Sequence, residues 1–149
     1  MRNDAVPRRS TVALDAVTPS EVITLAEGCI AHWSKPHVWD SENILRDRDR
    51  SDTRWVEEKL YEVRFHTPAD LWEVILAVVH RTDDMDVLGI LAAGPLENFL
   101  VDCGDKAIER IEALAAADHK FKHLLGGVWR NSMSDDLWRR ICGCRGDPW

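Results

Sequence analysis

The sequence lacks the signals that place a chain in a membrane or in the secretory route. It has no apolar run of the roughly 20 residues that a helix needs to cross a bilayer, because Glu73, His80, Arg81 and the Asp83–Asp84 pair interrupt the longest one. The early residues RNDAVPRR also lack the apolar stretch of a secretory signal. We therefore expect a soluble, cytoplasmic protein with no membrane partner.

Motifs of common catalytic and metal chemistry are missing as well. The sequence contains no G-x-S-x-G turn and no Gly-rich phosphate loop. Its four cysteines form no C-x-x-C pair and have no histidine at zinc-finger spacing, so we interpret them as reduced thiols. These absences favour a non-catalytic protein without a metal or cofactor, and an enzyme remains the alternative.

Basic charge is scarce in the middle of the chain. The whole sequence carries a formal charge of −7, and residues 67–127 hold eleven acidic against five basic side chains. A nucleic-acid-binding protein needs a basic face that displaces counterions from phosphates. The charge pattern therefore argues against nucleic acid and fits a basic protein partner better.

The length and composition indicate one globular domain. The chain has 149 residues, of which 45% are hydrophobic and 30% charged, and such a chain can bury a sizeable core. We expect a flexible N-terminal segment over residues 1–17 and a single helical domain over 18–141. Within that domain, residues 37–53 are expected to form a loop, with a solvated helix as the alternative, and residues 142–149 a flexible tail.

Helix start signals recur along the chain and predict an all-α fold. A residue with a capping side chain precedes five of the expected helices, at Thr18, Thr67, Asp83 or Asp84, Asp118 and Ser134, and a further helix is expected from Thr53. Gly94-Pro95 predicts the end of one helix and the start of the next, meeting at a sharp angle, and Gly104 predicts another helix end.

The residues after Pro68 predict the central element. Apolar side chains from Leu71 to Val79 occupy nearly all sides of a helix, so this helix should be buried, with a buried strand as the alternative. Short helices joined by short connections predict stacked antiparallel hairpins, arranged as a solenoid-like or irregular bundle. The echo between residues 70–75 and 136–141 is consistent with a repeat, although two copies of a short pattern also arise by chance.

Several segments together resemble a known family. LAAGPLENFL, IEALAAAD, FKHLLGGVW and DDLWRRI are similar to an uncharacterised bacterial domain-of-unknown-function family of small helical proteins. The resemblance covers about Leu71 to Ile141 and implies a helical fold, but no activity, substrate or cofactor. The positions that it marks are Gly94, Pro95, Leu96, Glu97, Gly104, Gly127, Val128, Trp129 and Trp138.

Five residues are candidates for a binding site. Asp83, Asp84 and Asp86 form the densest acidic cluster and could ligate a divalent cation, although helix capping in a solvated loop is the simpler interpretation. Glu97 follows the Gly-Pro turn in an apolar setting, and we interpret it as a capping residue at the third position of a helix. We add Trp129, one of the positions that the family resemblance marks. Trp39 and Trp149 lie in irregular segments where we expect partial exposure, and an exposed Trp beside charge suits a protein interface.

These observations support three hypotheses about function. The first is an acidic, non-catalytic module that binds a protein, in its specific form a bacterial immunity or antitoxin-type protein. The second is a metal-dependent enzyme or metal-binding protein, which requires Asp83, Asp84, Asp86 and Glu97 to converge on one cavity. The third is a structural homo-oligomer.

Overall fold

The computed structural model describes residues 16–34 and 52–149, and these residues form helices and turns without a β-strand. The all-α prediction is confirmed. The predicted flexible N-terminal segment and the expected loop at residues 37–53 lie almost wholly outside the described residues. The elements are α1 (Pro19–Trp33), α2 (Trp55–His66), α3 (Pro68–Val79), α4 (Met85–Leu91), the π-helix η2 (Ala92–Leu96), α5 (Glu97–Ala117), α6 (His119–Leu125) and α7 (Asp135–Cys144).

The helices begin where the capping residues predict. Thr18 Oγ1 accepts a hydrogen bond from the Glu21 N–H at 3.2 Å, and the Glu21 carboxylate accepts one from the Thr18 N–H at 2.8 Å, which completes a capping box. Side chains of Asp84, Asp118 and Ser134 likewise cap α4, α6 and α7. Thr67 precedes α3 without a side-chain cap. Short-range sequence rules therefore locate most of these helix starts.

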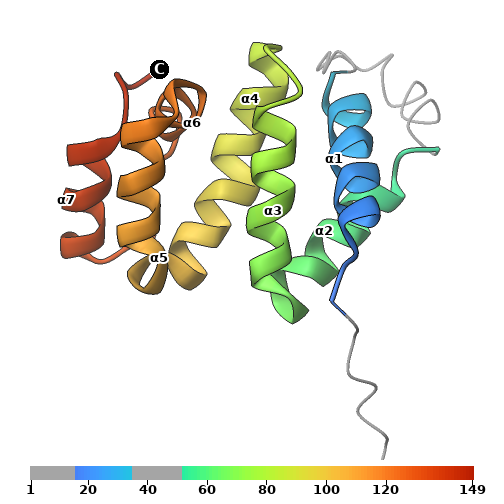
Figure 1. Cartoon of the computed structure of the whole chain (residues 1–149), viewed down its shortest axis with the longest axis horizontal. Coiled ribbons are helices and arrows are strands. Elements are labelled where there is room, and N and C mark those ends of the chain that lie inside the picture. The colour runs from blue at the N-terminus through green and yellow to red at the C-terminus, as the bar shows by residue number, and fades with distance from the viewer. Residues whose placement is uncertain (1–15, 35–51) are drawn as a thin grey trace, which may run out of the picture.

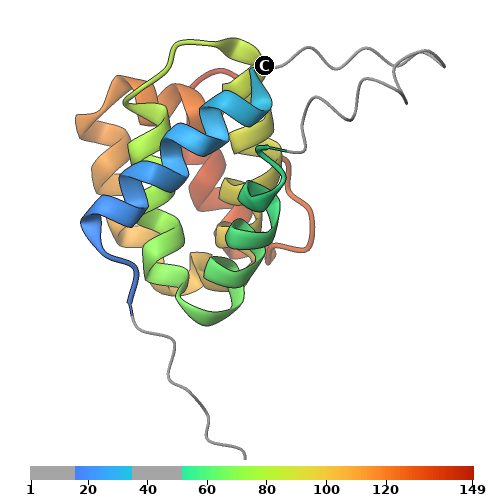
Figure 2. The ribbon, with the colours of Figure 1, turned by 90° about the vertical axis from the view of Figure 1, so that its right-hand side faces the viewer.

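Helix α3 occupies the centre of the fold, as its apolar composition predicts. In Figure 1 it stands between α1 on one side and the α4–α5 segment on the other, and Figure 2 shows α1 lying across it. Trp72 of this helix is 2% exposed. The centroid of its ring lies 5.1 Å from the ring centroid of Phe99 and 5.4 Å from that of Phe121. One large ring thus joins α3 to both α5 and α6.

The predicted helix break at Gly94-Pro95 is wrong. The chain remains helical through this dipeptide, because residues 92–96 form a π-helix that joins α4 directly to α5. In a regular α-helix a proline ring clashes with the carbonyl four residues earlier and its nitrogen cannot donate. A π-turn is wider, and here the Glu97 N–H reaches back to the Ala92 carbonyl. The wider turn accommodates Pro95 without ending the helix.

The chain changes direction later, within α5. The early residue Phe99 packs on Trp72, whereas the later residue Arg110 pairs with Glu73, one position further along α3. Figure 1 accordingly shows the segment descending beside α3 and then rising beside α7. The helical backbone continues through Gly104, where we predicted an end.

Residues 142–144, which we place in a flexible tail, belong to α7, and residues 146–149 pack against α6. The Gly146 N–H donates to the Lys122 carbonyl at 2.8 Å, and Trp149 Nε1 donates to the His123 carbonyl at 2.8 Å. The rings of His123 and Trp149 also stack, with centroids 5.2 Å apart. The physical reason is the Gly126-Gly127 pair, which lets the tail approach the backbone closely.

Candidate binding site

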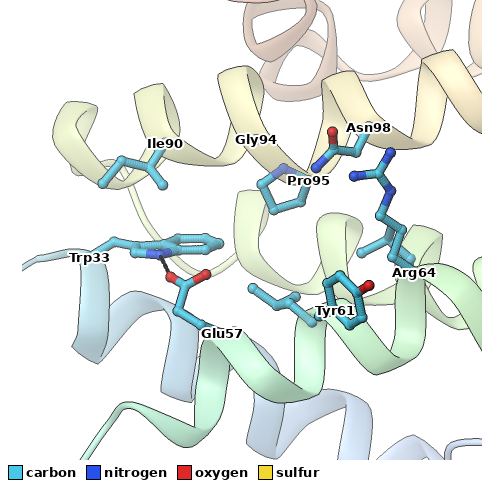
Figure 3. A pocket seen from close by; sticks show the side chains of 10 residues that line it. Trp33, Glu57, Tyr61, Arg64, Ile90, Gly94, Pro95 and Asn98 are labelled. Atoms are coloured by element: carbon cyan, nitrogen blue, oxygen red, sulfur yellow. Dashed lines mark hydrogen bonds between the residues drawn. The ribbon is translucent and has the colours of Figure 1, made fainter. Parts of the chain in front are cut away.

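A pocket of about 230 Å³ opens between α1, α2 and the π-helix (Figure 3). Its base is apolar and comes from Leu60 of α2 and Leu71 of α3, which are both buried. Ile90 of α4 lines the opposite side, and polar side chains complete the lining. The lining residues are Trp33, Glu57, Leu60, Tyr61, Arg64, Leu71, Ile90, Gly94, Pro95 and Asn98. The π-helix shapes one wall, because Gly94 and Pro95 both belong to it.

The Glu57 carboxylate is held at one end of the pocket. Its Oε1 accepts a hydrogen bond from Trp33 Nε1 at 3.2 Å and lies 3.4 Å from His32 Nε2. Trp33 is 3% exposed, whereas the Glu57 side chain is 58% exposed. A buried indole therefore orients a carboxylate that stays accessible to solvent.

Arg64 and Tyr61 line the other end of the pocket, and Phe65 lies next to both, outside the lining. Arg64 donates to Asp102 from Nε at 2.7 Å and from a terminal nitrogen at 3.2 Å, and this hydrogen bonding raises the pKa of Arg64. The guanidinium carbon also lies 4.8 Å from the centre of the Phe65 ring. Tyr61 and Phe65, with centroids 4.7 Å apart, are exposed to 69% and 54%. Both rings project from α2 into solvent.

The loop between α6 and α7 carries Trp129 and contacts the start of α5. Asn131 in this loop has a φ of 49°, in the left-handed region, and its side-chain amide donates to Glu97 at 2.8 Å. Arg130 pairs with Asp135 at the start of α7. These contacts hold the loop in place while Trp129, which is 74% exposed, faces solvent.

The structure corrects the roles of the predicted acidic residues. Glu97 does not cap a helix, because α4, the π-helix and α5 are continuous, and it binds Asn131 instead. Asp83 pairs with Lys120 at 2.7 Å. Asp84 caps α4, as we predicted for Asp83 or Asp84, by accepting from the Asp86 and Val87 N–H groups. Asp83, Asp84 and Glu97 therefore have three different structural roles, and Asp86 takes part through its backbone N–H.

The convergence that the metal hypothesis requires is not found. Within residues 16–34 and 52–149, which include all four acids, no three His, Cys, Asp or Glu side chains are grouped so as to hold a metal ion. The four acids therefore do not form a shared metal site in this part of the chain.

The sequence analysis missed the pocket and the exposed rings of α2. A signal was present, because Glu57, Tyr61 and Phe65 are spaced four residues apart and share one face of the helix. That face is separate from the buried stripe of Val56, Leu60 and Val63. Aromatic residues outside the apolar stripe of an amphipathic helix are the pattern that could have located this surface.

The fold and the site define an all-helical protein with an exposed aromatic surface beside a small pocket. The chain belongs to a family of unknown function (DUF6869), whose model matches residues 43–148. This match confirms the expected kind of family and extends beyond the segment that the resemblance covered. No curated protein and no solved structure matches the chain.

Among the described residues, the helical stretch Met85–Ala117 is long and apolar enough, by length and composition, to cross a membrane. Its most apolar window has a mean hydropathy of 1.3, and 44% of that window is buried inside the protein. Core helices of soluble proteins meet the same criterion. The stretch also includes the change of direction within α5, so it is not one straight rod.

Proposed function

We propose that this protein is a non-catalytic domain that binds another protein. Its binding surface comprises the pocket, the α2 rings Tyr61 and Phe65, and the loop that carries Trp129; we call this the aromatic face. The observation that carries the proposal is that Tyr61 and Phe65 are 69% and 54% exposed beside an apolar pocket of about 230 Å³. Clustered exposed apolar groups mark interaction sites on soluble proteins.

The composition of the aromatic face suits an interface. Trp, Tyr and Arg are the residues that dominate binding energy when a partner buries them. Here Tyr61 and Arg64 line the pocket, and Asp102 already fixes Arg64. Trp129 lies on the loop that Asn131 ties to Glu97, the neighbour in sequence of the pocket residue Asn98. The contacts of Asn131 and Arg130 hold the Trp129 loop before any partner arrives. Such preorganisation lowers the entropy cost of binding.

The charge of the protein favours a basic partner. The formal charge is −7, and long-range attraction between opposite charges speeds association and selects against acidic competitors. In its specific form, the proposal is a cytoplasmic immunity or antitoxin-type protein that covers a basic surface of a toxin. The acidic charge supports this form, and the identity of the captured partner tests it.

The test is affinity capture of the tagged protein from the organism that encodes it, with quantitative mass spectrometry. The double variant Tyr61→Ser/Phe65→Ser should lose a stoichiometric partner that the unmodified protein retains, and capture should weaken as salt rises. Met85→Ser is the matched control, because Met85 is 48% exposed and lies outside the pocket lining. Equal capture by both variants, or no stoichiometric partner, contradicts the proposal.

Light scattering on the purified protein separates a hetero-partner from self-association. The proposal predicts a monomer whose mass the double variant does not change. A dimer that the double variant dissociates would instead assign the aromatic face to contacts between copies of this chain.

A further inference from the structure

The geometry of the pocket points to the part of the partner that enters it. We infer that the pocket accepts one basic side chain, a lysine or an arginine, with its alkyl part on the apolar base and its cationic end at Glu57. This inference rests on the proposed function, since it specifies how the same surface recognises its partner.

The apolar base matches the alkyl part of such a side chain. Leu60 and Leu71 are 8% and 2% exposed and form part of the base, and Ile90 and Pro95 line the pocket on its other side (Figure 3). Lysine and arginine both carry a flexible aliphatic stem that packs on apolar surface while the charged end reaches a polar group. A volume of about 230 Å³ suits a single side chain.

Glu57 supplies the complementary charge. Both of its contacts, with Trp33 Nε1 and His32 Nε2, involve Oε1. Figure 3 shows the other carboxylate oxygen pointing toward the space between Pro95 and Tyr61. A carboxylate that is already oriented binds a cation with little additional loss of side-chain entropy.

Arg64, the basic side chain among the described lining residues, does not oppose a cation strongly. Two hydrogen bonds to Asp102 offset its charge. Arg64 and Glu57 also lie at opposite ends of the pocket (Figure 3). The Tyr61 ring stands at the edge, where it can cover the stem of the incoming side chain.

Nuclear magnetic resonance titration of the full chain tests this inference. The probes are the N-acetyl, N-methylamide derivatives of lysine and arginine, with those of norleucine and citrulline as uncharged controls of similar shape. The reporter is the Trp33 indole N–H, assigned from the spectrum of Trp33→Phe. We expect the lysine or the arginine probe to shift this signal and to bind roughly two- to fivefold more tightly than its uncharged control, the range for one exposed ion pair.

Two variants make the result specific to the pocket. Glu57→Gln keeps an oxygen that can accept from Trp33 but removes the charge, so it should abolish the preference for the cationic probes. Glu58→Gln is the matched control, because Glu58 is the neighbouring exposed acid and does not line the pocket. Equal binding of the charged and uncharged probes, no shift at the Trp33 signal, or an unchanged preference in Glu57→Gln would each overturn the inference.

The outcomes also separate this inference from the proposed function. Partner capture that depends on Tyr61 and Phe65 but not on the charge of Glu57 would support the proposed function. It would overturn the inference that a basic side chain of the partner enters the pocket. If the pocket prefers the cationic probes but no protein partner is captured, the pocket does bind a basic group and the proposed function is wrong.

Discussion

Gly127 leaves the space that the ring of Trp149 fills. A β-carbon placed on Gly127 would lie 2.7 Å from Cζ2 of that ring, and one on Gly126 would lie 2.3 Å from the carbonyl oxygen of Asp147. Both distances are shorter than any relaxed contact between these atoms. The two consecutive glycines therefore allow the residues after α7 to pack on the end of α6.

Substitution of Gly127 should accordingly destabilise the protein. Gly127→Ala forces the Trp149 ring to move, and overpacking of this kind costs about 1–3 kcal/mol. Gly143→Ala is the matched control, because nothing lies within 4 Å of a β-carbon there and the residue is helical, so it should be neutral or stabilise by up to about 1 kcal/mol. Urea unfolding measures both, and equal free energies of unfolding for the two variants would contradict this explanation of Gly127.

The helix caps could be predicted from the sequence, and the packing of the C-terminal residues could not. Thr18, Asp84, Asp118 and Ser134 cap N–H groups only two or three residues away, so their sequence neighbourhood contains the whole interaction. The Trp149 ring stacks on His123, 26 positions earlier in the sequence. Nothing in the local sequence of CGCRGDPW indicates that contact. The packing that orders this segment is tertiary.

The candidate site could be predicted only in part, because some of its contacts lie within one helix and others join different helices. The spacing of Glu57, Tyr61 and Phe65 lies within one helix and is visible in the sequence. The contribution of Trp33 is not, because it reaches Glu57 from a different helix, 24 positions away. Gly94-Pro95 was misleading, because the dipeptide has the same local signature at a helix break and in a π-turn.

The four cysteines should differ in reactivity. Burial, with a smaller contribution from the charge of Glu57, raises the pKa of Cys29 to about 12, so its nucleophilic thiolate is scarce near pH 8. Cys142 is exposed on α7. Iodoacetamide should therefore label Cys142 in the folded protein and Cys29 only after unfolding, as peptide mass spectrometry can measure. Labelling of Cys29 at the rate of Cys142 in the native protein would contradict this burial.

The pair of His80 and Asp118 should contribute to the pH dependence of stability. His80 Nε2 lies 2.5 Å from Asp118 Oδ2, and this hydrogen bond, with those from the Phe121 and Lys120 N–H groups, lowers the pKa of Asp118 from its ordinary value of 3.8. A carboxyl with a lowered pKa in the folded state stabilises the fold above its unfolded pKa. That stabilisation is lost as the pH falls through the folded pKa.

Asp118→Asn tests this contribution, since asparagine still caps a helix but cannot ionise. The free energy of unfolding of the unmodified protein should fall more steeply below about pH 4 than that of the variant. Circular dichroism during urea unfolding at a series of pH values gives both curves. If the free energies of unfolding of the two proteins run parallel against pH, Asp118 has the same pKa in the folded and unfolded chain, which would contradict this prediction.

The acidic cluster between α3 and α4 should separate into one capping residue and one surface ion pair. Asp84 Oδ1 accepts from the Asp86 N–H at 2.9 Å and the Val87 N–H at 3.4 Å, so Asp84→Ala should cost about 1 kcal/mol, a typical value for loss of an N-cap. Asp83 is 87% exposed and pairs with Lys120, so Asp83→Ala should cost well under about 1 kcal/mol.

Salt distinguishes the two effects further. The loss in Asp83→Ala should vanish as salt screens the ion pair, whereas the loss in Asp84→Ala should persist, because it comes mainly from unsatisfied N–H groups at the start of α4. Thermal unfolding at low and high sodium chloride concentration measures this difference. Both losses should also be the same with and without added magnesium, since the described acids form no ion-binding group. A rise in melting temperature with magnesium that Asp83→Ala and Asp84→Ala both abolish would instead require a shared cation at this turn.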